Sequence, residues 1–417
     1  MLTDYICALD IGSSKISAVV CGIKRKRITN IFFNTVPSKG IKRGAVIDSI
    51  ELVGCIGRIL KNLKVKSGIN IKFIYTNISG QDIVTRHSHA IIPLAERGNK
   101  VITISDIQKV NEQARILGSS LDEEIIYKMP LYYTIDSNNN ISNPLGLYSH
   151  RLEVDLYLIC AKLSSIQTIT RVVNQAGYEI KNLFFSGIAT SKVIFNRKIE
   201  EGLNLLCDIG RDITELLIFK NGLLCNIEVL ALGGDDLTEK LQGALKMPFD
   251  LAEDVKKSYG ITGDYSQINE DKEILVKRDN IYKPIKQKLV SQIITSKTKL
   301  ICQNIKDAVE KKVDLITVDN FVIAGRTILL EGFLETLENI LGVPVKPGRI
   351  ADPDIIPLAK KENALSGQNY LNYLTSLGII CEALKDRQPQ TLPANQPSPS
   401  LILRAINRFK EVYQEYF

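Results

Sequence analysis

Two stretches of this chain combine an aspartate, a glycine and polar residues in the manner of a phosphate-binding turn. The first reads Asp10-Ile11-Gly12-Ser13-Ser14-Lys15 and lies between two apolar runs that predict a strand–turn–strand. Gly12 permits a tight turn. The hydroxyls of Ser13 and Ser14, nearby N–H groups and the Lys15 cation can converge on phosphate oxygens, and Asp10 can hold a hydrated Mg²⁺ ion. The pattern also fits an ordinary hairpin, so this stretch alone leaves both interpretations open.

A second copy of the pattern stands about half a chain length further on. It reads Asp208-Ile209-Gly210-Arg211-Asp212-Ile213-Thr214, again between two apolar runs. Each copy is followed by a further strand and then by a predicted helix, at 49–64 and at 235–246. The duplication predicts two related α/β halves with a cleft between them. A phosphate chain would be held there from both sides, with Mg²⁺ on Asp10 and Asp208.

Composition is that of an ordinary globular protein, with 45% apolar and 24% charged residues and enough length for two or more domains. The formal net charge of +7 is small for 417 residues, and basic residues are spread along the chain. This argues against a nucleic-acid-binding protein but not against contact with anionic lipid. The run Lys24–Arg27 fits a solvated hairpin tip more simply than a docking patch.

The eight cysteines stand singly, without a C-x-x-C pair, and most lie inside apolar runs. This favours a reducing cytoplasm over a disulfide or zinc framework. The first residues lack the features of a secretory signal, and no run reaches transmembrane length. We therefore expect a cytoplasmic protein.

Between about residues 82 and 162 the pattern changes to that of a small inserted α+β module. A helix is predicted to begin near the capping pair Ser105-Asp106, and strands are predicted at 83–94, 124–135 and 151–161. The module holds all three histidines, His87, His89 and His150. His87 and His89 share a strand face and could ligate a metal, but no cysteine or suitably spaced carboxylate accompanies them in the sequence.

The second half is predicted to be mostly helical after its hairpin. Helices are expected at 250–259 and 281–312, with a charged hairpin or loop at 266–282 between them. An apolar strand at 319–324 runs into Gly325-Arg326, and a last core helix is expected at 371–385.

The end of the chain is predicted to be a tethered amphipathic helix. Residues 387–400 contain four prolines and almost no large apolar side chains, which is typical of a disordered linker. The helix that follows has an apolar face and a weakly cationic polar face. It would either dock on the protein's own core or, as the proline-rich tether favours, lie in a membrane surface. The membrane-binding residues would be Leu401, Ile402, Ala405, Ile406, Phe409, Val412, Tyr413, Tyr416 and Phe417.

Together, the duplicated turns, the inserted module and the tethered helix resemble the FtsA family of actin-like bacterial cell-division proteins. The motifs that carry this resemblance extend over nearly the whole chain. They are the phosphate motifs Ala8–Val20 and Cys207–Phe219, the loop Lys39–Asp48, the strand exit Asn77–Ile83, the N-P-x-G stretch Asn143–Gly146, the adenosine motif Ile323–Phe333 and the closing-helix motif Tyr373–Gly378.

The resemblance implies an α/β, actin-like duplicated fold of the actin/Hsp70/sugar-kinase superfamily with an inserted small α+β module. It implies ATP and Mg²⁺ as cofactors. It also implies self-assembly into filaments on the inner face of the cell membrane at the division site, tethering of FtsZ, and recruitment of later division membrane proteins. No nucleic acid is implied as a partner.

The resemblance also assigns residues and domains. The nucleotide is placed on Asp10, Gly12, Ser13, Ser14, Lys15, Asp208, Gly210, Arg211, Thr214, Gly325 and Arg326. The implied domains are 1–82 with 163–201 and a closing helix 363–385, the module 83–162, a second core 202–232 with 311–362, a subdomain 233–310, a linker 386–400 and a membrane helix 401–417.

Two departures from the family pattern bear on mechanism. Where the family has D-I-G-G-G-T-T-D, Arg211 and Asp212 replace two glycines. Arg211 could supply a replacement cation, whereas Asp212 would repel phosphate unless it faced Mg²⁺ or solvent. In the adenosine motif a glycine pair has become Gly325-Arg326, and Arg326 would either stack on adenine or occlude its place. We therefore expect ATP binding with slow or absent hydrolysis and no turnover enzyme.

Two alternative functions stay open. A PilM-like pilus-assembly adaptor shares the same branch of the superfamily, but such proteins generally lack the tether and the terminal helix. An active ATPase or sugar kinase of the superfamily would need a catalytic Asp in a glycine-rich setting, and a chaperone ATPase would need a β-rich substrate domain. Neither pattern is visible in the sequence.

Overall fold

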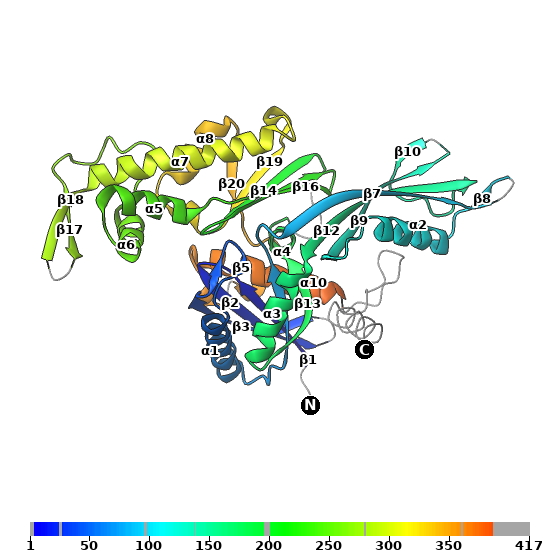
Figure 1. Ribbon diagram of the computed structural model, residues 1–417, viewed down its shortest axis with the longest axis horizontal. Coiled ribbons are helices and arrows are strands. Elements are labelled where there is room, and N and C mark those ends of the chain that lie inside the picture. The colour runs from blue at the N-terminus through cyan, green and yellow to red at the C-terminus, as the bar shows by residue number, and fades with distance from the viewer. Residues whose placement is uncertain are drawn as a thin grey trace. The chain divides into compact units, whose positions relative to one another are not determined.

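The computed structural model describes residues 4–24, 27–95, 98–136, 138–195, 201–278, 281–359 and 362–386, and it consists of two compact units (Figure 1). The first comprises Met1–Arg197 and Ile350–Phe417, and the second comprises Lys198–Arg349. Each unit contains a five-stranded sheet with both antiparallel and parallel pairs. Among the described helices, none combines the length and the apolar character that crossing a membrane requires.

The five-stranded sheet of the first unit has the order β13-β6-β1-β2-β3. Successive side chains of a strand point to opposite faces, so Cys7, Leu9 and Ile11 of β1 join the core under α1 and α3. Asp10 points to the other face, where α10 packs. The elements are β1 (Asp4–Ile11), β2 (Lys15–Lys24), β3 (Arg27–Pro37), β6 (Phe73–Ile78), β13 (Glu179–Phe185), α1 (Ser49–Ser67), α3 (Leu163–Gln175), α4 (Ser186–Ile194) and α10 (Leu374–Asp386).

Helix α1 has well-defined ends. The side chain of Asp48 caps its N-terminus by accepting from the N–H groups of Ile50 and Glu51, and Gly68, with a φ of 70°, ends it in the left-handed conformation. Before α1, β4 (Ile41–Lys42) and β5 (Ala45–Val46) form a small hairpin. The helix predicted from the sequence at 49–64 has the observed start and ends three residues before the observed end at Ser67.

The inserted module is a four-stranded sheet, in the order β10-β9-β12-β7, with α2 packed on one face. Helix α2 begins at Ile104, within one residue of the predicted start, but the predicted cap was wrong. Thr103 is the N-cap, and Asp106 completes a capping box by accepting from the Thr103 N–H. The elements are β7 (Ile83–Pro93), β8 (Lys100–Val101), α2 (Ile104–Leu117), β9 (Glu123–Ile135), β10 (Asn138–Ile141), β11 (Tyr148–Ser149) and β12 (Arg151–Lys162).

The five-stranded sheet of the second unit has the order β16-β15-β14-β19-β20. The elements are β14 (Leu203–Ile209), β15 (Thr214–Lys220), β16 (Leu223–Leu230), α5 (Gly234–Leu245), α6 (Phe249–Tyr259), β17 (Glu273–Arg278), β18 (Ile281–Lys286), α7 (Gln287–Glu310), β19 (Asn320–Ala324), α8 (Phe333–Leu341) and β20 (Val345–Pro347). The prediction of a helix from 281 was wrong for its first turn and a half. Residues 281–286 pair with β17 as a hairpin, and Pro284 disfavours a helix there because it lacks an N–H.

Candidate functional site

The two predicted phosphate turns have the same backbone geometry. Gly12 N–H donates to the Lys15 carbonyl at 3.1 Å, and Gly210 N–H donates to the Ile213 carbonyl at 2.9 Å. A Cβ added to Gly12 would lie 3.1 Å from the Lys15 carbonyl oxygen, and one added to Gly210 would lie 3.0 Å from the Ile213 carbonyl oxygen. Glycine is therefore favoured at both turns by close approach, since neither residue has a positive φ. The duplicated turn that the sequence predicted is therefore present in both units.

Asp10 is the centre of a buried polar network at the first hairpin, which is formed by β1 and β2. Its carboxylate accepts from Asn77 Nδ2 at 3.0 Å and from Ser17 Oγ at 3.2 Å, and Lys15 Nζ lies 3.8 Å away. Asn77 is itself fixed because its Oδ1 accepts from the Ile11 N–H at 2.7 Å. Burial raises the pKa of Asp10, and Lys15, Ser17 and Asn77 oppose that rise.

The end of the first unit reaches back to this hairpin. Lys15 Nζ donates to the carbonyl of Asn372 at 2.5 Å, and the hydroxyls of Ser17 and Ser376 lie 2.5 Å apart. Asn372 and Ser376 belong to the short 3₁₀ turn Asn369–Asn372 and to α10. The closing helix predicted at 363–385 therefore contacts Lys15 and Ser17 directly. Ser14 at the turn is exposed, and Ser13 is partly exposed.

Arg211 at the second hairpin, which is formed by β14 and β15, is directed to a carboxylate. Its Nε lies 2.8 Å and 2.9 Å from the two oxygens of Asp235, in the first turn of α5. The guanidinium also stands over the ring of Phe249, 5.6 Å from its centre. Burial raises the pKa of Asp235, and its hydrogen bond and charge pairing with Arg211 oppose that rise. The expected replacement cation is thus partly neutralised.

The start of α5 lies against the second turn. Gly234 N–H donates to the Gly210 carbonyl at 3.1 Å, and Asp235 N–H donates to the Arg211 carbonyl at 2.6 Å. A Cβ on Gly233 would lie 2.7 Å from the Arg211 carbonyl oxygen, and one on Gly234 would lie 2.9 Å from Thr327 Oγ1, so both positions favour glycine. The sequence interpretation missed Gly233, Gly234 and Asp235, although a Gly-Gly pair directly after a strand was the available signal.

A buried ion pair supports this turn from α6. Lys256 Nζ donates to the Gly234 carbonyl at 2.8 Å and to the Thr238 hydroxyl at 2.7 Å, and it pairs with Glu253. Burial lowers the pKa of Lys256. Burial alone would raise the pKa of Glu253, but the charge of Lys256, with hydrogen bonds from Lys256, Thr238 and Lys257, brings it to about 2. None of these contacts was predicted.

The residues that face Asp10 and Asp208 across their hairpins differ in charge. Asp10 is paired across the ladder with Ser17, whereas Asp208 is paired with Glu215. Directly opposite residues share a sheet face, so a second carboxylate, which is buried, stands next to Asp208. Asp212 is also buried. The second hairpin therefore carries more negative charge than the first.

The adenosine motif meets the second hairpin within its own unit. Asp208 pairs in register with Ala324 at the end of β19, so Gly325 and Arg326 leave the sheet beside the turn. Gly325 has a φ of 87°, and a Cβ there would lie 2.2 Å from the Ile209 carbonyl oxygen. Arg326 is exposed and begins a 3₁₀ turn. Thr327 Oγ1 donates to the Gly210 carbonyl at 2.7 Å, which fixes the motif to the turn.

Thr214, which was predicted to contact phosphate, is buried within the second unit. Its hydroxyl donates to the Leu232 carbonyl at 2.9 Å, just before the paired glycines. In this structure Thr214 holds the hairpin against the segment that leads into α5.

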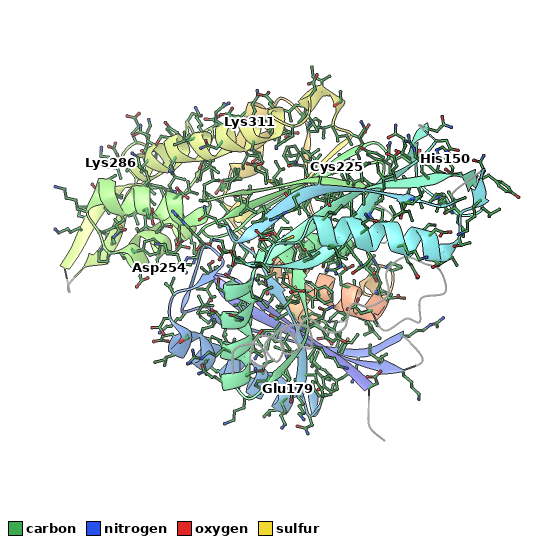
Figure 2. All side chains as sticks on the ribbon, turned by 45° about the vertical axis from the view of Figure 1, so that its right-hand side comes forward. His150, Glu179, Cys225, Asp254, Lys286 and Lys311 are labelled. Atoms are coloured by element: carbon green, nitrogen blue, oxygen red, sulfur yellow. The ribbon has the colours of Figure 1, made fainter. Side chains whose placement is uncertain are left out.

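The three histidines of the inserted module each lie beside a carboxylate. His87 Nδ1 lies 2.9 Å from Asp155, and His89 Nε2 lies 3.3 Å from Glu153. His150, labelled in Figure 2, lies 2.8 Å from Asp136. The sequence missed these carboxylates because β12 supplies two of them. Over the described part of the chain, no three His, Cys, Asp or Glu residues form a group able to hold a metal.

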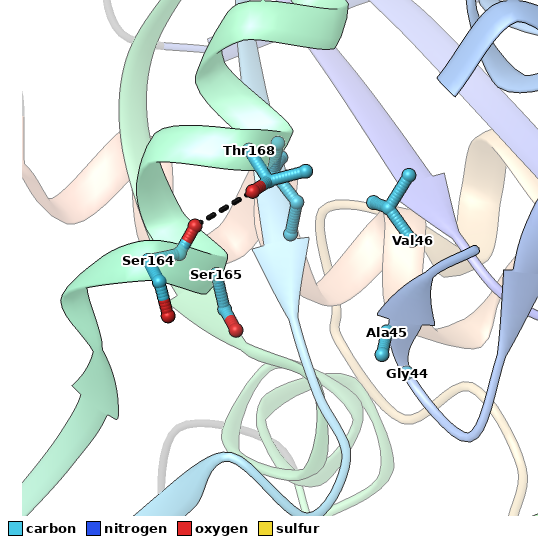
Figure 3. A pocket seen from close by; sticks show the side chains of 7 residues that line it. Gly44, Ala45, Val46, Ser164, Ser165 and Thr168 are labelled. Atoms are coloured by element: carbon cyan, nitrogen blue, oxygen red, sulfur yellow. Dashed lines mark hydrogen bonds between the residues drawn. The ribbon is translucent and has the colours of Figure 1, made fainter. Parts of the chain in front are cut away.

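A cavity of about 110 Å³ lies in the first unit between the β4–β5 hairpin and the start of α3 (Figure 3). Its polar wall comes from α3, where Thr168 Oγ1 donates to the Ser164 carbonyl at 2.7 Å and Ser165 Oγ donates to Asp82 at 2.6 Å. No predicted nucleotide-binding residue lines it. The linker and membrane helix predicted at 387–417 lie outside the described residues.

Two family models match this chain. Residues 205–374 match the model described as "Cell division protein FtsA", and residues 80–160 match "SHS2 domain inserted in FTSA". Together the matches span more than half of the chain, and the second coincides closely with the inserted module.

Curated relatives extend this similarity over most of the chain. The cell division protein FtsA of Bacillus subtilis (strain 168) is 25% identical over 386 residues, which is 92% of this chain and 84% of the relative. FtsA of Pseudomonas aeruginosa is 24% identical over 347 residues, 82% of each chain.

Solved structures show the fold. The PilM–PilN type IV pilus biogenesis complex matches with a TM-score of 0.63 and 16% identity, covering 92% of this chain and 99% of the other. MreB5 of Spiroplasma citri bound to ADP matches with a TM-score of 0.50 and 11% identity, covering 89% and 100%. The predicted actin-like fold with an inserted module is confirmed.

Proposed function

Because this chain belongs to the FtsA family of cell-division proteins, we propose that it is a membrane-tethered, actin-like adaptor that binds ATP, assembles into filaments and links FtsZ to the inner face of the cell membrane. Recruitment of later division membrane proteins belongs to the same proposal. The domain boundaries predicted from the sequence are retained with it.

The network around Asp10 is the observation that carries the nucleotide part of the proposal. It keeps a carboxylate and the Lys15 cation beside a glycine turn whose serines are exposed or partly exposed, a set of groups that fits a phosphate chain with Mg²⁺. ATP–Mg²⁺ would supply a polyanion and a cation to the two hairpin turns. Asp10, Gly12, Ser13, Ser14 and Lys15 would hold it in the first unit. In the second unit we assign Asp208, Gly210, Arg211, Gly325 and Arg326, with Mg²⁺ on Asp10 and Asp208. The predicted phosphate contact of Thr214 is not retained, because its buried hydroxyl donates to the Leu232 carbonyl.

The second hairpin supports binding without efficient hydrolysis. Arg211 is already paired with Asp235, and Glu215 adds a carboxylate beside Asp208. A cation that is already paired and an added carboxylate stabilise the negative charge that develops during phosphoryl transfer less well than a free cation does. We therefore propose that hydrolysis is slow or absent.

Equilibrium titration of the full chain with fluorescent ATP tests the nucleotide part. We expect saturable, Mg²⁺-dependent binding that Asp10→Asn weakens strongly, and multiple-turnover phosphate release close to background. Absence of saturable binding would refute ATP as the ligand, whereas sustained phosphate release would refute slow hydrolysis and leave binding intact.

Recruitment of FtsZ to vesicles tests the tether. With purified FtsZ and vesicles of mixed phosphatidylethanolamine and phosphatidylglycerol, we expect FtsZ to sediment with lipid only when the full chain is present. Replacing Ile406 and Phe409 by glutamate should strongly reduce this, since the change removes two large apolar groups from the predicted membrane face. A chain that binds lipid but not FtsZ would support a different adaptor role, such as that of a PilM-like protein.

A further inference from the structure

The outer face of α1 carries positive charge and exposed aliphatic side chains together. The inner face is fully buried and includes Leu52, Ile56, Ile59 and Leu63. At 100° per residue the opposite face contains Ile50, Arg58, Lys61, Lys64 and Val65, and each of these five residues is exposed. In Figure 1, α1 lies at the margin of its unit.

Large aliphatic groups stand exposed at both ends of this face. Ile50 is 84% exposed and Val65 is 79% exposed, and Ile47, just before the helix, is 67% exposed. Single exposed aliphatic residues are common on protein surfaces. Here they border a row of cations on one helix, which gives the face an amphipathic edge.

The segment around this helix carries a net positive charge. Residues 39–66 contain seven Lys or Arg and two Asp or Glu. Of the acids, Asp48 is engaged as the N-cap and Glu51 lies 3.9 Å from Lys39. Arg58, Lys61 and Lys64 form no ion pair with any residue that the structure describes.

Two glycines lie within the same helix without a packing reason. An added Cβ on Gly54 or Gly57 would meet nothing within 4 Å. Glycine inside a helix lowers the stability of the helix relative to alanine. At these two positions glycine therefore lowers stability, and no close contact within this unit requires it. They leave the middle of the face flat, which suits close approach to an extended surface.

We infer that the outer face of α1 lies against an anionic lipid surface and forms a second membrane contact of the protein, an inference that rests on the proposed membrane association. Cations bind the anionic headgroups, and aliphatic residues at the two ends enter the apolar boundary beneath them. An acidic protein or a nucleic acid would be met by the cations but would leave Ile50 and Val65 without a role. The predicted tail helix has only a weakly cationic face, so α1 would supply the preference for anionic lipid.

Fourteen residues, 387–400, separate the end of α10 from the predicted tail helix, and a chain of that length spans at most about 50 Å when extended. Two linked contacts bind far more tightly than either alone.

Vesicle binding of the full chain tests this inference. The variant R58E/K61E/K64E is compared with K299E/K311E/K312E, which makes the same charge change at exposed cations of α7 and its end (Figure 2 labels Lys311). On vesicles of equal parts phosphatidylethanolamine and phosphatidylglycerol we expect the α1 variant to bind on the order of 100-fold more weakly and to lose much of its salt dependence. We expect the α7 variant to bind like the unmodified chain.

A fluorescence measurement locates the contact. The chain contains no tryptophan, so Ile50→Trp gives a single probe on the α1 face. Leu300→Trp, at a position 52% exposed on α7, gives a matched control. We expect the Ile50→Trp emission to shift to shorter wavelength on anionic vesicles and to be quenched by brominated lipid, and the Leu300→Trp emission to stay unchanged.

The outcomes separate this inference from the proposed function. If the unmodified chain binds vesicles but both charge variants bind equally well, or if the Ile50→Trp probe stays in water, α1 is not a membrane contact and the face belongs to a protein partner. If the unmodified chain binds no vesicle, the proposed tether fails as well. If replacing Ile406 and Phe409 by glutamate removes binding to phosphatidylcholine vesicles while α1 still senses anionic lipid, both contacts are supported.

Discussion

The two hairpins share a turn but differ in what their charged side chains contact. At the first, Asp10 and Lys15 belong to one network that extends to the carbonyl of Asn372. At the second, Arg211 is bound to Asp235 from the following helix. Backbone geometry has thus been kept where the surrounding charge has changed. The comparison indicates that the turn is a requirement of the fold, and we propose that the side chains around it set the affinity for nucleotide.

The largest expected effect is on the turn of the adenosine motif, where Gly325 lies against the second hairpin. Gly325→Ala places a Cβ 2.2 Å from the Ile209 carbonyl oxygen at a φ of 87°, whereas Gly12→Ala meets the Lys15 carbonyl at 3.1 Å with an ordinary φ. We expect Gly325→Ala to lower the free energy of unfolding by about 4 kcal/mol and Gly12→Ala by about 1 kcal/mol. Urea denaturation of the full chain measures both. Similar losses would mean that the turn at Gly325 and the first hairpin turn are equally constrained.

The next effect concerns the ion pair that supports the start of α5. The folded-state pKa of Glu253 is about 2, below its ordinary value of 4.5, so its stabilisation is present above pH 4.5 and is lost as the pH falls towards 2. We expect Glu253→Gln to cost roughly 3 kcal/mol near pH 7, because it leaves Lys256 buried without its partner. The difference from the unmodified protein should shrink below pH 4.5.

The control for this prediction is a pair on the surface of α7. Glu310 lies 3.8 Å from Lys306 and is well exposed. We expect Glu310→Gln to change stability by less than about 0.5 kcal/mol, with little pH dependence. Urea unfolding curves, recorded at several pH values between about 3 and about 7, compare the free energies of unfolding of the two variants. A constant difference for Glu253→Gln across this range would contradict the ion-pair explanation.

How far the sequence predicted this arrangement depends on how local each feature is. The hairpins, α1 and the inserted module follow from apolar periodicity and turn residues, and all were found. The pairs Lys15–Asn372 and Arg211–Asp235 join residues that only the tertiary fold brings together, so no spacing rule reveals them. The first turn and a half of the helix predicted at 281–312 was wrong because strand pairing with β17 overrides a helical pattern interrupted by Pro284.

A smaller effect tests whether Asp235 competes with phosphate for Arg211. Asp235→Asn removes the negative charge and weakens the hold on the guanidinium, so we expect ATP to bind about tenfold more tightly. Asp250→Asn removes the same charge from an exposed position at the start of α6. We expect it to change the affinity for ATP by less than about twofold. Equilibrium titration with fluorescent ATP measures both. Unchanged or weaker binding by Asp235→Asn would show that the pair supports the nucleotide site instead of opposing it.

The smallest effect concerns the link between the first hairpin and α10. The Ser17 hydroxyl donates to Asp10 and lies 2.5 Å from the Ser376 hydroxyl. We expect Ser17→Ala and Ser376→Ala each to lower the free energy of unfolding by about 1 kcal/mol, and the double variant to lower it by less than the sum, with a coupling of about 0.5 kcal/mol or more. Thr170→Ala on α3, whose hydroxyl donates only to its own helix at Ile166, should not couple to Ser17→Ala. Because Ser17 also donates to Asp10, its loss should weaken ATP binding more than loss of Ser376. If Ser17→Ala and Ser376→Ala are additive and affect ATP binding equally, α10 closes the first unit without influencing the charge of the hairpin, and the contrast between the two hairpins rests on Arg211 and Glu215 alone.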